Sequence, residues 1–100
     1  MSGEDWIRSV CIEMPEGARN HVCWRVVVRR LFLAYQTTAR KRGRRPMEAD
    51  RFLEKVLAIF PRARLSDWRF VDGAWEKELD GIRAPGLPIP LPPREMAIGR

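Results

Sequence analysis

A chain of 100 residues, 45% of them hydrophobic, is long enough for one domain with a modest core and too short for two. Its net charge of +6 favours an anionic partner, whether nucleic acid, an acidic protein or a membrane surface. A membrane-spanning protein is disfavoured because no stretch approaches the roughly 18 consecutive apolar residues of a membrane span. The first residues, Met-Ser-Gly-Glu-Asp-Trp, lack the pattern of a secretory leader, so we expect a cytoplasmic or nucleoid-associated protein.

The charges are separated along the chain. Residues 1–18 carry four acidic residues against one arginine, whereas residues 19–64 carry thirteen Lys and Arg residues against three acidic ones. Residues 65–80 are acidic again, with five Asp and Glu residues against two cations. Solubility alone does not require such a separation, so the pattern favours a directed basic face.

The first predicted helix covers residues 4–14. Its apolar residues recur at helical spacing, and Pro15 and Gly17 follow as helix-stopping residues. The recurring apolar residues are Trp6, Ile7, Val10, Cys11 and Met14.

The second predicted helix, residues 20–41, is the central one. Asn20 is a good N-cap residue, and an apolar stripe runs from Trp24 to Tyr35. The flanking residues Cys23, Val26 and Leu33 add more apolar surface than one packing contact needs. Two explanations stay open: deeper burial within the same domain, which is the commoner case, or a homodimer contact through residues 20–35.

A third helix and a hairpin follow a break in the chain. Gly43 and Pro46 end the central helix, and residues 47–60 show a further helical pattern that stops at Pro61. Residues 65–71 and 74–79 are predicted as paired strands joined at the turn signal Asp72-Gly73. Residues 84–93 are rich in proline and favour an extended tail or strap.

Three helices closed by a two-stranded hairpin are the plan of a winged helix-turn-helix. We therefore predict a mainly α fold with a small β-hairpin, in which residues 1–83 form the winged-helix domain and residues 84–100 a Pro-rich tail. Short motifs add to this reading: Leu31-Phe32-x-x-Tyr35, Arg42-Gly43-x-x-Pro46, Phe52-x-x-x-Val56, Phe60-Pro61 and Asp80-Gly81-Ile82-Arg83.

These motifs resemble two winged-helix families. One is the C-terminal domain of phage and poxvirus-type helicase-primases, and the other is the DNA-binding domain of the regulatory factor X (RFX) transcription factors. The resemblance implies binding of duplex or replication-fork DNA without catalysis. Two features depart from these families: the hairpin is net acidic, unlike the arginine-rich RFX wing, and residues 19–27 form a longer connection than those families use.

The candidate binding residues are cations of the basic middle and of the hairpin. Five cations crowd into residues 40–45, whereas complementing a helix dipole needs only one or two, so we expect phosphate contacts there. Arg51 and Lys55 form a like-charged pair that a bound anion would relieve, although neighbouring acidic residues can also screen it. The full predicted set is Arg40, Lys41, Arg42, Arg44, Arg45, Arg51, Lys55, Arg62, Arg64 and Arg69.

Other conspicuous residues are expected to have structural roles. The four tryptophans Trp6, Trp24, Trp68 and Trp75 are expected to anchor the core, with base stacking as the alternative. We expect Arg25, Arg29 and Arg30 to form a solvated face. Cys11 and Cys23, with the single histidine His21, do not have a zinc-site spacing, so both cysteines are expected to be reduced core residues.

The sequence contains no catalytic constellation, so we predict a non-enzymatic protein without cofactor or metal. The leading hypothesis is a DNA-binding module of phage-type replication or of transcription regulation. The alternative is a small protein-binding factor, such as a phage-encoded inhibitor or adaptor that places its basic face against an acidic partner. RNA binding is a minor option because the signatures of the common RNA folds are missing.

Overall fold

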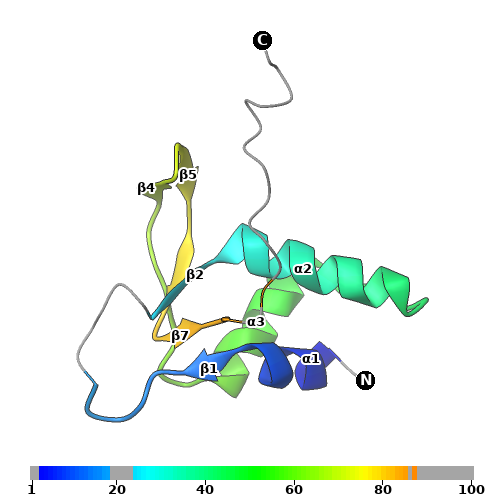
Figure 1. Ribbon diagram of the computed structural model, residues 1–100, viewed down its shortest axis with the longest axis horizontal. Helices are drawn as coiled ribbons and strands as arrows, with labels where there is room; N and C mark the ends of the chain where they lie inside the picture. Colours follow the sequence, from blue (N-terminus) through cyan, green and yellow to red (C-terminus); the bar gives the residue numbers. More distant parts are fainter. Residues whose placement is uncertain (1–2, 19–23, 86, 88–100) are drawn as a thin grey trace.

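The computed structural model describes residues 3–18, 24–85 and 87, and Figure 1 shows how its elements are arranged. The helices are α1 (Gly3–Val10), α2 (Val28–Lys41) and α3 (Ala49–Ile59). The strands are β1 (Ile12–Glu13), β2 (Arg25–Val27), β3 (Arg64–Leu65), β4 (Arg69–Val71), β5 (Ala74–Glu76), β6 (Glu78–Asp80) and β7 (Ile82–Arg83).

The strands form three small antiparallel sheets. One sheet has the order β2-β6-β3, a second pairs β1 with β7, and the third is the β4-β5 hairpin. Ser66 connects the first sheet to the hairpin through two hydrogen bonds to Glu78. The Ser66 N–H donates to the Glu78 carbonyl at 2.8 Å, and the Ser66 hydroxyl accepts from the Glu78 N–H at 2.9 Å. Residues 66–78 therefore form a two-stranded extension of the β3-β6 pair, here called the arm. The base of the arm contacts the start of α2, and its β4-β5 end extends beyond the rest of the fold (Figure 1).

This architecture corrects the predicted winged helix with three helices and a two-stranded wing. Residues 25–27, assigned to the central helix by their pattern, form strand β2, in which Arg25, Val26 and Val27 pair with Asp80, Leu79 and Glu78. A run of three valines at 26–28 has stiff β-branched side chains that fit a pleated strand well, and pairing with β6 outweighs the helical periodicity. The fold is thus a mixture of helices and three sheets.

The other helix boundaries also differ from the predicted ones. The first helix ends at Val10 instead of residue 14, because Ile12 and Glu13 pair with Arg83 and Ile82, which are distant along the chain. The third helix starts at Ala49 and ends at Ile59, close to the predicted range. Of the Pro-rich tail, only residues 84, 85 and 87 are described, and the predicted strap otherwise lies outside the described residues.

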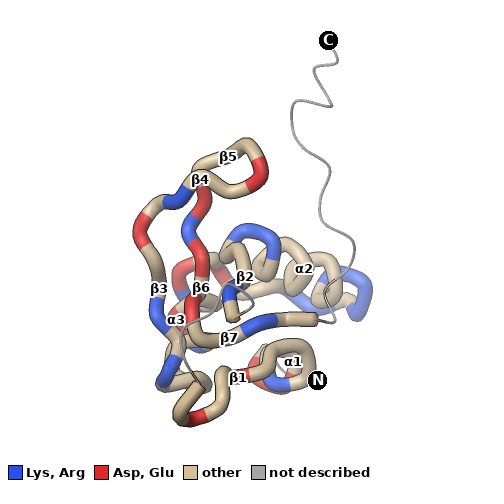
Figure 2. The backbone as a smooth tube through the Cα atoms, turned by 60° about the vertical axis from the view of Figure 1, so that its left-hand side comes forward, with Lys and Arg blue, Asp and Glu red and all other residues tan. Residues whose placement is uncertain are grey.

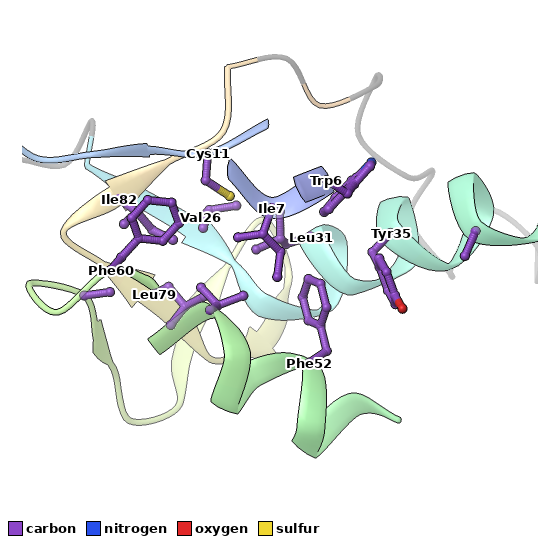
Figure 3. Packing of buried hydrophobic residues seen from close by; sticks show 13 residues of the cluster. Trp6, Ile7, Cys11, Val26, Leu31, Tyr35, Phe52, Phe60, Leu79 and Ile82 are labelled. Carbon is purple, nitrogen blue, oxygen red and sulfur yellow. The ribbon is translucent and has the colours of Figure 1, made fainter. Parts of the chain in front are cut away.

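The core lies where all three helices meet β6 and β7 (Figure 3). Its fully buried side chains are Ile7, Leu31, Phe52, Val56, Leu79 and Ile82. Beside them, the Tyr35 ring stacks on Phe52 at a centroid distance of 4.7 Å, and Trp6 meets Tyr35 edge-on at 5.7 Å. Val26, which suggested a dimer contact, is buried within this same domain.

Cys11 is a buried free thiol, as predicted for a core cysteine. Burial disfavours the thiolate and raises the pKa of Cys11 from 9.0 to about 12. Cys23 and His21 lie outside the described residues.

Candidate nucleic-acid interface

The basic cluster of residues 40–45 surrounds the C-terminal end of α2. Gly43 ends the helix in a left-handed conformation, with φ at +69°, and its N–H donates to the Arg40 carbonyl at 3.0 Å. The Arg44 N–H turns back to the Ala39 carbonyl at 2.8 Å, so the chain reverses there. This reversal places the cations of the last helical turn and those of the following loop around one helix end, where Figure 2 shows them in blue.

Most of these cations have no acidic partner. Arg40, Lys41, Arg44 and Arg45 are exposed, and their side chains make no ion pair with any residue of the described ranges. The negative end of the α2 dipole complements one or two of them. The remaining positive charge stays available for an anionic partner.

A small cavity opens beside the same cluster. It has a volume of about 110 Å³ and is bordered by Arg42, Arg44 and Arg45, while Trp6 and Tyr35 contribute aromatic surface. Tyr35 is held in place because its hydroxyl accepts a hydrogen bond from the Met47 N–H at 3.0 Å. A water molecule occupies about 30 Å³ in the liquid, so the cavity has room for a few waters or one phosphate group.

The predicted binding residues of α3 are divided in the structure. Arg51 is exposed and has no ion-pair partner in the described part of the chain. Lys55 instead meets Glu4 of α1, with Nζ 3.0 Å from Oε2. The repulsion expected between Arg51 and Lys55 is therefore relieved by an acidic side chain of the protein itself.

The remaining predicted residues make contacts that join parts of the fold. The Arg62 backbone N–H donates to Glu13 at 3.0 Å, and its guanidinium lies 3.7 Å from Glu13 and from Glu16. Arg64 donates to the carbonyls of Pro61 and Ala63. Arg62 lies just before β3 and Arg64 is its first residue, so these contacts hold the start of β3.

Arg69 of β4 is held by two acidic residues of β6. It donates to Asp80 at 2.7 and 2.8 Å and to Glu78 at 2.9 Å. These hydrogen bonds, to Asp80 first and then to Glu78, raise the pKa of Arg69 above its ordinary value. An arginine held this way stabilises the fold and has little freedom to contact a partner.

The arginines of β2 and the first turn of α2 are likewise paired with acidic residues of the arm and of β6 instead of forming a solvated face. Arg29 Nε donates to Glu76 at 3.0 Å, and this hydrogen bond raises the pKa of Arg29. Arg25 lies 3.7 Å from Asp80, and Arg30 lies 3.9 Å from Asp72. Glu76, Glu78 and Asp80 are thus neutralised from within. Asp72 is 82% exposed, and Asp67 is exposed without an ion-pair partner in the described chain.

The tryptophans have three different environments. Trp6 is buried in the core as predicted, and the half-buried Trp24 is covered by the Arg83 guanidinium at 4.6 Å. The prediction of a core role is wrong for Trp68 and Trp75, whose exposed fractions are 62% and 65%. The period-two alternation of the strands predicted that one face of the arm would be exposed, but it did not show which face.

Comparisons with protein-family models, with curated proteins and with solved structures gave no match. The resemblance to the helicase-primase and RFX families therefore stays a prediction. In the described part of the chain, none of the helices has the length and apolar content needed to cross a membrane. The same residues contain no group of three metal-ligating side chains.

Proposed function

We propose that this protein is a nucleic-acid-binding module that holds DNA phosphates with the basic cluster at the end of α2. The observation that carries the proposal is the contrast among its arginines. Those of β2, of the first turn of α2 and of the arm are paired with acidic residues, whereas Arg40, Lys41, Arg44 and Arg45 are exposed and lack such partners among the described residues.

Four such cations at one helix end suit a polyanion. Each Lys or Arg that neutralises a phosphate releases condensed counterions, which supplies affinity without sequence specificity. The neighbouring 110 Å³ cavity adds a place where one phosphate can sit against three arginines. The resemblance to the two families implies replication or transcription as the setting, and hence the cytoplasm or the nucleoid as the location.

The test is a fluorescence-anisotropy titration of the whole chain with labelled duplex, forked and single-stranded DNA at low and moderate salt. If the four cations contact four phosphates, raising the salt from about 50 mM to about 200 mM lowers duplex affinity about 150-fold. A variant with Arg40, Lys41, Arg44 and Arg45 changed to glutamine then binds weakly, with little dependence on salt.

A matched pair of single variants separates the cluster from overall charge. Arg44→Gln and Arg8→Gln remove the same charge, and Arg8 is exposed on α1 without an ion-pair partner in the described chain. We expect Arg44→Gln to flatten the logarithmic salt dependence by about 0.9 and Arg8→Gln to leave it unchanged. Equal effects of the two variants contradict the proposal. So does the absence of binding to any DNA at low salt in a folded sample, and in that case an acidic protein becomes the expected partner of the basic cluster.

A further inference from the structure

The arm carries its aromatic residues on one face. In the β4-β5 register, Phe70 is paired with Trp75 and Arg69 with Glu76, so these two pairs point to opposite faces. The Phe70 and Trp75 rings meet edge-on, with centroids 5.5 Å apart. The same alternation adds Trp68 and Lys77, and Lys77 Nζ lies 5.3 Å from the Trp68 ring centroid. These four residues form what is here called the outer face.

The opposite face of the arm holds two of its four acidic residues. Glu76 and Glu78 are buried, with exposed fractions of 8% and 7%, and they bind Arg29 and Arg69. Arginines therefore match these two carboxylates, whereas Asp67 and Asp72 are exposed, and Asp72 lies 3.9 Å from Arg30. Of the four residues of the outer face, Lys77 is the one with an ionised side chain.

Exposure of this face is unusual for its residue types. Trp68, Phe70 and Trp75 are 62–65% exposed, and every large exposed hydrophobic residue of the arm is aromatic. Three adjacent exposed rings are a large apolar area to leave in water, which marks a binding surface. Rings beside a cation suit stacking on nucleobases, with the ammonium available to a phosphate.

We infer that the outer face of the arm stacks on unpaired bases, so that the protein prefers forked or single-stranded DNA over duplex. This inference rests on the proposed function and adds a second contact to it. Lys77 beside the Trp68 ring favours a nucleic acid here, because Glu76 and Glu78 are buried against arginines. The exposed carboxylates of Asp67 and Asp72 lie outside the four residues of the outer face. A protein partner or a second copy of this chain is the competing occupant.

The positions of the two surfaces suit a fork. The arm lies at the start of α2, where the Val28 N–H donates to the Lys77 carbonyl at 2.9 Å, and the basic cluster lies at the other end. A helix of 14 residues is about 21 Å long, which corresponds to roughly six stacked nucleotides. Duplex phosphates at the basic cluster and an unpaired strand reaching the arm would thus occupy both surfaces at once.

The test compares the wild-type chain with a variant in which Trp68 and Trp75 are changed to leucine, which keeps apolar side chains but removes the rings. Titrations use a blunt duplex and forks with single-stranded tails of increasing length. We expect wild-type affinity to rise with tail length until about six nucleotides and then level off. The variant loses this gain, about 5- to 150-fold per stacked base, and binds the blunt duplex like the wild type.

Two further measurements make the result specific. A Trp75→Phe variant, which keeps a ring at this position, retains most of the gain. Oligodeoxythymidine quenches tryptophan fluorescence in the wild type more strongly than in the leucine variant. Circular dichroism confirms that the variants fold, as expected for exposed positions.

The failures of the two proposals are distinguishable. Duplex binding with no effect of the leucine variant on forks overturns the stacking inference and leaves the proposed function intact. Absence of binding to every DNA overturns both. A concentration-dependent dimer in light scattering that the leucine variant abolishes assigns the outer face to a second copy and overturns the inference.

Discussion

The ion pair between Arg29 and Glu76 is expected to be the main anchor of the arm on α2. The Glu76 side chain is only 10% exposed and that of Arg29 is 39% exposed, and both Nε and Nη2 of the guanidinium donate to the carboxylate. Breaking a fully buried pair costs about 3–5 kcal/mol, whereas exposed pairs contribute about 0–1 kcal/mol. Because water reaches Arg29, we expect an intermediate coupling energy of about 1–2 kcal/mol.

A double-mutant cycle measures this coupling. Urea unfolding of Arg29→Ala, Glu76→Ala and the double variant gives the interaction free energy after the separate effects of each truncation are subtracted. The matched control is the cycle for Lys55 and Glu4, whose side chains are 37% and 47% exposed at 3.0 Å and whose coupling should be below about 0.5 kcal/mol. A coupling between Arg29 and Glu76 no larger than that of the control would refute the reasoning that burial strengthens the anchor.

Two other predictions concern the core. Gly81 has a φ of +94°, and a Cβ there would lie 2.7 Å from the Arg62 carbonyl oxygen, so Gly81→Ala should lower the free energy of unfolding by about 3 kcal/mol. Gly17→Ala, at a similar φ of +84° but in open space, should cost only about 1 kcal/mol in the same urea titration; equal losses would contradict the collision. The raised pKa of Cys11 means that the unfolded thiol ionises before the folded one, so stability falls as pH rises from 9 towards 12 by roughly 1 kcal/mol per pH unit. Unfolding at pH 8 and pH 10 should show this decline in the wild type and a smaller one in Cys11→Ala; parallel declines would contradict it.

Local signals in the sequence predicted several features correctly. The turn at Asp72 and Gly73 is confirmed, with φ values of +50° and +87°, and so is the helix end at Gly43. The third helix and its buried face, including Phe52 and Val56, also agree with the periodicity. These features depend on residues within one or two turns of each other, which a pattern in the sequence records directly.

The residues of β2 show why the fold class was wrong. Val26 and Val27 fit a helical stripe as well as a strand, and the deciding partner, β6, lies about fifty residues further along the chain. Pairing with that strand buries both valines and supplies backbone hydrogen bonds that no local pattern can reveal. The predicted wing consequently became part of a larger arrangement of three sheets.

By itself, the sequence determined the separation of charge, the turns, the third helix and the concentration of cations at residues 40–45. The tertiary structure decided which cations remain available, because Arg29 of α2 meets Glu76 of β5 and Arg69 of β4 meets Asp80 of β6. It also decided that Trp68 and Trp75 face water, since strand alternation defines two faces of the arm but not which one α2 covers. Composition and spacing are properties of neighbours along the chain, whereas neutralisation and burial depend on which segments meet in space.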